Sequence, residues 1–176
     1  MAAVTLASDY IPLDLHCIEM ESGVESPDQW REYAASAFDE SNRIMEDSGS
    51  LHPVFHFFVP DAASVGGASG RPCMALIEFP SGIEDDCWKA VKVAANRIGA
   101  QGCLMLGEAD VDDGCVVLGR VETPYFRLWF EADVSESDVG IRSIAEDVHE
   151  VSDAQVSAFL DTEDAPLRSI WNIASA

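Results

Sequence analysis

The sequence is short of basic residues. It contains 10 lysines and arginines, of which Lys89 and Lys92 are the only lysines, against 32 aspartates and glutamates, so its formal net charge is −22 over 176 residues. Proteins that bind DNA, RNA or anionic membranes directly use clustered Lys and Arg side chains to displace counterions. The composition therefore argues against direct contact with nucleic acid or membrane. A strongly negative surface instead favours basic partners, cations, adaptation to high salt or simply solubility, and net charge alone does not choose among these.

Long apolar runs are also lacking. The first residues show no basic start followed by a hydrophobic stretch, and no segment approaches about eighteen consecutive apolar residues. We therefore expect neither a signal peptide nor a transmembrane helix. The expected location is cytoplasmic.

Cysteine is not arranged in close pairs. An odd number of cysteines without a CxxC spacing fits reduced thiols, packed as small apolar groups, better than a disulfide framework or a zinc site. We expect no structural disulfide, no metal and no cofactor. The five cysteines are Cys17, Cys73, Cys87, Cys103 and Cys115.

Apolar residues nevertheless make up 48% of the chain, enough for a packed core in one compact unit. The first clear element is a helix that begins after Ser26, where Pro27 and Gln29 complete a capping box. Apolar residues then recur at three- and four-residue steps from Trp30 to Met45, and the pattern stops before Gly49.

A second helix is predicted from a capping box at Ser81 and Glu84 to a cap at Gly99. Short apolar runs with turn residues between them predict the strands, at 51–59, 73–79, 103–109, 115–123 and 125–132. The first two strands form a hairpin with a long flexible loop. This order predicts an α+β fold with helices packed on one face of a mainly antiparallel sheet. The predicted core comprises Trp30, Phe38, Phe57, Leu76, Trp88, Val91, Leu104, Val117, Leu128 and Phe130.

The composition divides the chain into three parts. Residues 1–25 form an extended arm that adds an edge strand, and residues 26–133 form the α+β core domain. Residues 134–176 form an acidic C-terminal helical segment, because the apolar residues from Ile141 to Val148 keep helical spacing and eleven acids face one base between Glu131 and Asp164. The apolar tail of this segment is expected to dock on the body or on a partner.

The region from Trp30 to Ala109 resembles small α+β domains of uncharacterised phage and bacterial proteins. In those domains a helix, a strand pair, a second helix and a further strand follow one another, and here Glu108 and Ala109 would close the last strand. The resemblance covers less than half of the chain and brings no activity with it.

Three sequence patterns that indicate metal or phosphate sites in other proteins lack the required spacing or structural context here. The acidic turn at 110–114 lacks the spacing of a calcium loop, with Val121 where a bidentate Glu belongs. His16, His52 and His56 have no zinc-type spacing. The glycine-rich segment 66–71 joins two strands rather than a strand and a helix, and it lacks the P-loop lysine. With no GxSxG motif either, an enzyme is the minority interpretation.

Two hypotheses remain. The first is a non-enzymatic acidic binding protein that occupies a basic, nucleic-acid-binding surface of a partner protein, as a DNA mimic or a phage-type inhibitor does. The second is a small α+β domain with a ligand pocket or an unrecognised enzymatic activity, whose acidity reflects only solvation or salt adaptation. A homo-oligomer is compatible with both. Under the first hypothesis the partner-binding residues are Asp28, Glu32, Asp39, Glu40, Glu46, Asp47, Glu146, Asp147, Glu150 and Asp153.

Overall fold

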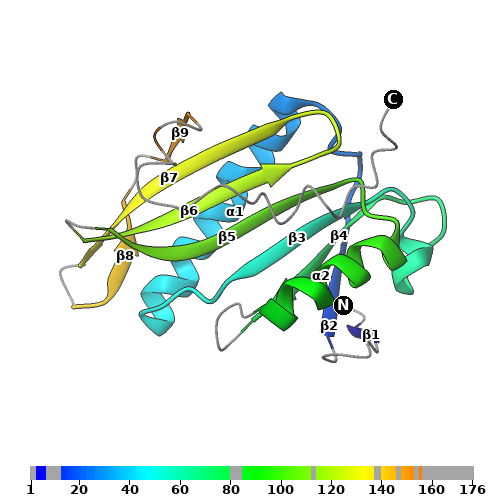
Figure 1. Ribbon diagram of the computed structural model, residues 1–176, viewed down its shortest axis with the longest axis horizontal. Coiled ribbons are helices and arrows are strands. Elements are labelled where there is room, and N and C mark those ends of the chain that lie inside the picture. The colour runs from blue at the N-terminus through cyan, green and yellow to red at the C-terminus, as the bar shows by residue number, and fades with distance from the viewer. Residues whose placement is uncertain are drawn as a thin grey trace.

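The protein has a mixed α+β fold, in which a curved antiparallel sheet carries two helices (Figure 1). The computed structural model describes residues 3–6, 13–79, 85–111, 114–136, 140–145, 148–152 and 155. Its helices are α1 (Pro27–Ser48) and α2 (Asp85–Ile98), with a short 3₁₀ helix, η1 (Ala62–Val65). Its strands are β1 (Ala3–Leu6), β2 (Leu13–Glu19), β3 (Val54–Val59), β4 (Cys73–Glu78), β5 (Gly102–Val111), β6 (Gly114–Glu122), β7 (Arg127–Glu136), β8 (Arg142–Ile144) and β9 (His149–Val151).

The described strands form one sheet in the order β1-β2-β4-β3-β5-β6-β7-β8, and β9 also pairs with β7. Every pairing among the described strands is antiparallel, in agreement with the predicted mainly antiparallel sheet. The predicted β3–β4 hairpin is confirmed, and so is the reversal between β5 and β6. Strand β2 pairs with β4 on one side and with β1 on the other, so β1 rather than β2 lies at the edge.

Helix α1 begins and ends where its local sequence predicts. The side chain of Ser26 accepts a hydrogen bond from the Gln29 backbone N–H at 3.3 Å, and the Gln29 side chain accepts one from the Ser26 N–H at 2.9 Å. At the other end Gly49 adopts a left-handed φ of 75°, and its N–H donates to the Met45 carbonyl. Helix α2 also ends at a left-handed glycine, Gly99, which has a φ of 67° and whose N–H donates to the Asn96 carbonyl.

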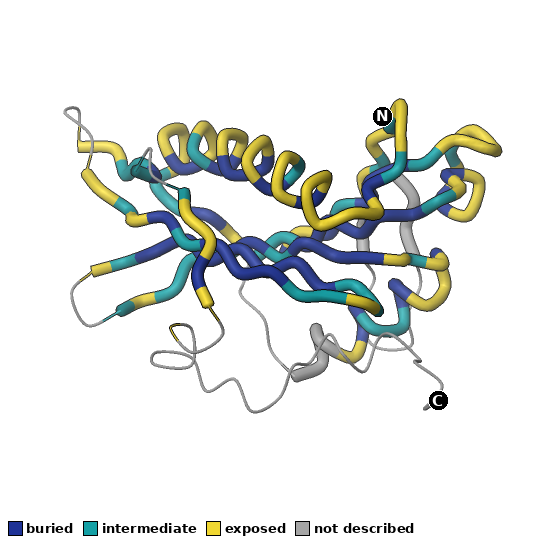
Figure 2. The backbone as a smooth tube through the Cα atoms, turned by 90° about the horizontal axis from the view of Figure 1, so that it is seen from above, coloured by how far each residue is buried: buried dark blue, intermediate teal, exposed yellow. Residues whose placement is uncertain are grey.

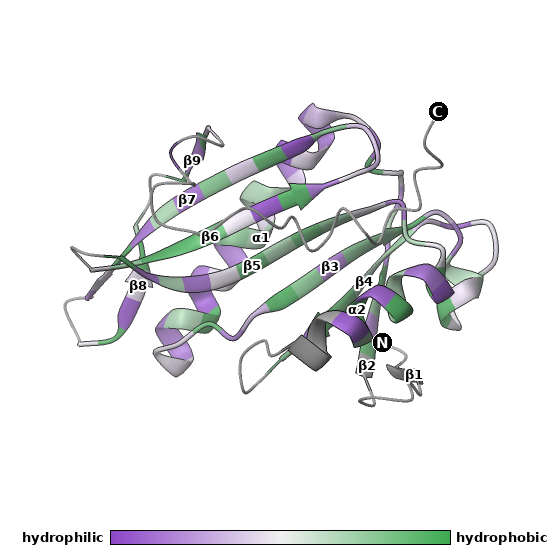
Figure 3. Ribbon diagram, viewed as in Figure 1, coloured by the Kyte–Doolittle hydropathy of each residue, from purple (hydrophilic) through white to green (hydrophobic). Residues whose placement is uncertain are grey.

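The two helices pack on opposite faces of the sheet, so the predicted arrangement on one face is wrong (Figure 2). Phe55 and Phe57 of β3 pack in a cluster with α2, whereas the intervening His56 and the following Phe58 point to the α1 face. Because β3 is buried on both sides, its run of apolar residues does not reveal how they divide between two helices. Hydrophobic residues dominate the central strands and hydrophilic ones the turns of α1 in Figure 3.

The predicted core is largely confirmed. Nearly all of its described members are buried, with Leu76 half-buried, and the side chain of Trp88 lies outside the described set. Trp30, Phe38 and Met45 of α1 are each at most 1% exposed. The described helices include none that is long and apolar enough to cross a membrane.

The helix predicted from the spacing of Ile141 to Val148 is wrong where the structure describes this segment. Strand β8 pairs with the end of β7, and β9 pairs with its middle. Gly140 has a φ of 77°, and the backbone N–H of Ile144 donates to the Asn42 side chain at 2.7 Å instead of to a helical carbonyl. Backbone pairing with β7 therefore overrides the short helical spacing. The rest of the predicted C-terminal segment beyond Gln155, including its docking tail, lies outside the described residues.

Candidate functional site

The six acidic residues predicted on the first helix are all exposed on α1. Four of them lie along one line on its outward side: Asp28, Glu32, Asp39 and Glu46. An α-helix turns about 100° per residue, so their spacing places them within about 40° of one another around the helix axis. At 1.5 Å per residue the line is roughly 27 Å long. We call these four residues the acidic ridge.

The basic residues of α1 are already in ion pairs. Arg31 binds Asp28 at 2.9 Å and Glu150 at 2.8 Å, and Arg43 binds Glu40. Six acids and two arginines leave the helix with a net charge of 6 − 2 = 4 negative units. Asp47, beside the ridge, is exposed. The α1 surface therefore stays acidic after its internal pairs are counted.

The predicted C-terminal site residues are only partly described. Glu146, Asp147 and Asp153 lie outside the described residues. Glu150 lies in β9 rather than on a helix, and two of its oxygens accept from Arg31 at 2.8 and 3.3 Å. Hydrogen bonding to Glu150 raises the pKa of Arg31 above its ordinary value. The structure thus brings Glu150 to the N-terminal half of α1, where it neutralises a base.

A groove of about 260 Å³ lies between α1 and the strands β2, β4 and β3. It is lined by His16, His52 and His56, whose spacing in the sequence did not predict a zinc site. The register explains part of the grouping, because Leu76 of β4 pairs with His16 on one side and His56 on the other. Within the described part of the chain, no three His, Cys, Asp or Glu side chains are placed to hold a metal ion.

His56 is the buried polar residue of this groove. Its Nδ1 lies 2.7 Å from the Tyr33 hydroxyl, and the two rings meet edge to face at 5.7 Å. Burial lowers the pKa of His56 to about 4, and burial raises the pKa of the Tyr33 phenol above its ordinary value. Both side chains are therefore uncharged at neutral pH. Sequence reasoning missed this pair, because only the fold brings α1 next to β3.

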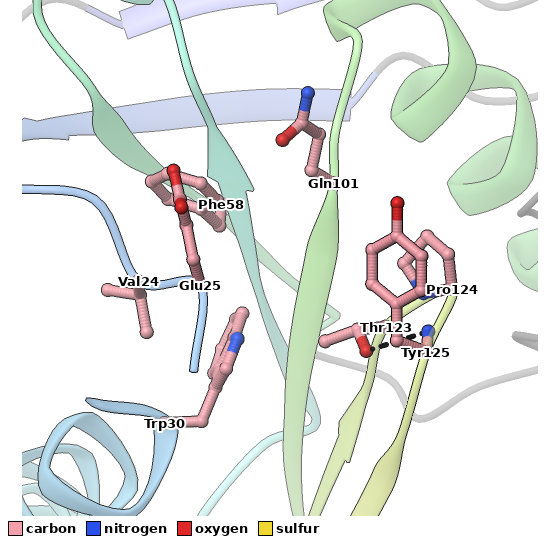
Figure 4. A pocket seen from close by; sticks show the side chains of 8 residues that line it. All are labelled: Val24, Glu25, Trp30, Phe58, Gln101, Thr123, Pro124 and Tyr125. Atoms are coloured by element: carbon pink, nitrogen blue, oxygen red, sulfur yellow. Dashed lines mark hydrogen bonds between the residues drawn. The ribbon is translucent and has the colours of Figure 1, made fainter. Parts of the chain in front are cut away.

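A second hollow, of about 400 Å³, lies between the start of α1 and the turn from β6 to β7 (Figure 4). Val24 and Trp30 stand on one side, with Thr123 and Tyr125 on the other. Tyr125 is 91% exposed, and its N–H donates to the Thr123 hydroxyl oxygen at 3.2 Å. Trp30 Nε1 is buried and has no hydrogen-bond partner among the described residues. The hollow combines aromatic and polar surface without a nucleophile beside a base.

The glycine-rich loop does not form a phosphate cradle. Asp61 caps η1, and its Oδ1 accepts from the N–H groups of Ala63 and Gly70, each at 3.0 Å. These backbone bonds lower the pKa of the Asp61 carboxyl. The N–H groups of Gly66 and Gly67 donate hydrogen bonds to carbonyl groups of η1. The loop predicted to be flexible is thus held by its own hydrogen bonds around a carboxylate, which would repel an anion.

The described thiols offer no activated nucleophile. Cys17, Cys73, Cys103 and Cys115 are all free. Burial, together with a hydrogen bond that the Cys73 thiol makes to Cys17, raises the pKa of Cys73 to about 12, and burial also raises the pKa values of Cys103 and Cys115. Cys73, Cys103 and Cys115 therefore stay protonated at neutral pH, whereas the thiolate is the reactive form.

One buried ion pair was not predicted. Arg120 and Glu122 of β6 are 6% and 2% exposed and bind each other, and the Arg120 guanidinium lies 4.7 Å from the ring centre of Trp129. The sequence signal that could have predicted this pair is the presence of two charged residues within an otherwise apolar strand. Such a pair adds little net stability, because the desolvation of both charges offsets their attraction.

Comparison of the chain with protein-family models, with curated proteins and with solved structures found no match.

Proposed function

We propose that this protein is an acidic binding protein whose α1 surface binds a basic surface of a partner protein. The observation that carries the proposal is the acidic ridge, a straight line of four exposed carboxylates on a well-capped helix. A helix fixed by capping at both ends and by buried anchors presents these charges in a constant geometry. Such preorganisation lowers the entropy lost on binding.

The electrostatics of the whole chain support this proposal. A net charge of −22 produces a field that attracts basic partners and accelerates their encounter. At physiological salt the Debye length is about 8 Å, shorter than the ridge, so the partner must place basic groups close to individual carboxylates. We therefore expect Lys or Arg residues of the partner to lie along α1.

The finer form of the proposal is that the partner surface normally binds nucleic acid, as for a DNA mimic or a phage-type inhibitor. The ridge carries about one charge per 9 Å of helix, from a 1.5 Å rise per residue, whereas duplex DNA carries about one per 1.7 Å of its axis. The ridge alone therefore reproduces only part of the charge density of DNA. Competition with nucleic acid then requires further carboxylates outside α1.

A pair of matched variants tests the role of the ridge. Glu32→Gln, Asp39→Asn and Glu46→Gln together remove three ridge charges and leave the Asp28–Arg31 pair intact. Glu21→Gln, Asp133→Asn and Glu136→Gln remove three exposed charges elsewhere. We expect a cell lysate to yield a basic protein that binds the immobilised parent and control at low salt but not the ridge variant. Equal retention by all three proteins, or no retained basic protein, would contradict the proposal.

A further inference from the structure

The groove beside α1 exposes large apolar side chains. Val54 and Leu76 line it from the sheet, and Ala37 from the helix. Ile18 of β2 and Ile44 of α1, which also line it, are 49% and 43% exposed. Ligand sites are typically concave and apolar, with a few polar groups that fix orientation. The groove has this composition, and α1 leaves it open because the helix covers only part of its face of the sheet.

His56 supplies the orienting polar group. It is 8% exposed and lines the groove, and its Nδ1 faces Tyr33, so Nε2 lies on the opposite side of the ring. Among the described residues, Nε2 has no hydrogen-bond partner, and the Tyr33 hydroxyl has none besides His56. When the Tyr33 phenol donates to Nδ1, the neutral imidazole carries its proton on Nε2. In this tautomer the groove contains an N–H donor, His56 Nε2–H, that has no acceptor among the described residues.

The charges around the groove select the ligand further. Glu78 and Glu40, which also binds Arg43, line it and are exposed, and the chain as a whole carries a charge of −22. An anionic ligand would be repelled by these carboxylates, whereas an uncharged or cationic ligand would not.

We propose that this groove binds a small apolar molecule, uncharged or cationic, that presents one hydrogen-bond acceptor such as a carbonyl oxygen to the Nε2–H of His56. The proposal does not rest on the acidic ridge, which lies on the outward side of α1. The two proposals can therefore fail separately.

Three probes of similar shape separate the contributions. Acetophenone has an aromatic ring and a carbonyl acceptor, ethylbenzene lacks the acceptor, and benzoate carries a negative charge. In NMR titrations of the full chain we expect acetophenone to shift resonances of Ile18, Ile44 and the His56 ring saturably. Ethylbenzene should bind about 3- to 10-fold more weakly, the effect of one hydrogen bond, and benzoate more weakly than acetophenone.

Variants keep the test independent of folding. His56→Phe removes the donor and should lower acetophenone affinity to that of ethylbenzene. Ile44→Ala changes an exposed side chain and should weaken both probes, whereas Ile141→Ala, exposed outside the groove, should change neither. Absence of saturable shifts at the groove in the parent would overturn the proposal, as would equal affinity for acetophenone and ethylbenzene or an unchanged affinity in Ile44→Ala.

Discussion

The indole ring of Trp30 lies directly over Gly102. A Cβ atom placed on Gly102 would be 2.5 Å from Cζ2 of Trp30, closer than real Cβ contacts allow. Trp30 is fully buried and belongs to the core between α1 and the sheet. We therefore expect Gly102→Ala to displace the ring and to lower the free energy of unfolding by about 1–3 kcal/mol, as overpacking does. Chemical denaturation of the variant measures this loss.

Gly107 provides the control within the same strand. A Cβ there would have its nearest neighbour, Pro53, at 3.8 Å, an ordinary contact. Gly107→Ala should therefore change stability much less than Gly102→Ala. Equal losses in the two variants would show that the close approach of Trp30 to β5 is not the cause.

The pKa of His56 predicts a loss of stability in mild acid. Burial lowers its folded-state pKa from 6.5 to about 4, so between these values the unfolded state binds a proton that the native state does not. The stability that depends on keeping His56 neutral is fully present above about pH 6.5, and it is lost progressively as the pH falls to about 4. The full difference corresponds to about 3 kcal/mol. Denaturation curves between these pH values measure it.

A double variant isolates this effect from the titration of carboxylates. Tyr33→Phe retains His56, whereas Tyr33→Phe combined with His56→Phe removes the titrating ring without leaving the phenol unpaired. The single variant should lose stability more steeply than the double variant as the pH falls from 6.5 to 4. Parallel pH profiles would mean that His56 is protonated as readily in the folded state as in the unfolded one.

The parts of this fold that depend on neighbouring residues could be predicted from the sequence, and those that depend on distant pairing could not. The capping box of Ser26 and Gln29 is local, so the start of α1 was predicted correctly. The division of Phe57 and Phe58 between two helices depends on which helix covers which face. The exposed acids of α1 were predicted because they follow from the helical spacing of one segment. The groove around His56 was not predicted, because it forms between α1 and strands that are distant in the sequence.

The ion pair between Arg31 and Glu150 predicts a local effect on β9. Removing it with Glu150→Gln should cost at most about 1 kcal/mol globally, because both side chains are partly exposed. Strand β9 is short and pairs only with β7 among the described strands, so its amides should exchange hydrogen faster. Asp28→Asn, which removes the other partner of Arg31, should leave this exchange unchanged. Unaltered β9 exchange in Glu150→Gln would contradict a role for the pair in holding β9.

The raised thiol pKa values predict an order of alkylation. Cys73 and Cys103 are fully buried with raised pKa values, whereas Cys17 is only half-buried. In the native protein at mildly alkaline pH, iodoacetamide should therefore modify Cys17 before Cys73 and Cys103. Mass spectrometry of the digested protein gives the order, and denaturation should abolish it. Modification of Cys73 as early as Cys17 would contradict the burial of this thiol.

Displacement of labelled DNA from the partner retained by α1 tests the proposed function most sharply. The parent and the variant with Glu21, Asp133 and Glu136 neutralised should displace the DNA at similar concentrations. The variant with Glu32, Asp39 and Glu46 neutralised should need a higher concentration, mainly because its association is slower, and the difference should shrink as salt rises from about 0.1 M to about 1 M. Equal displacement by all three proteins would show that the acidic ridge serves solvation rather than recognition.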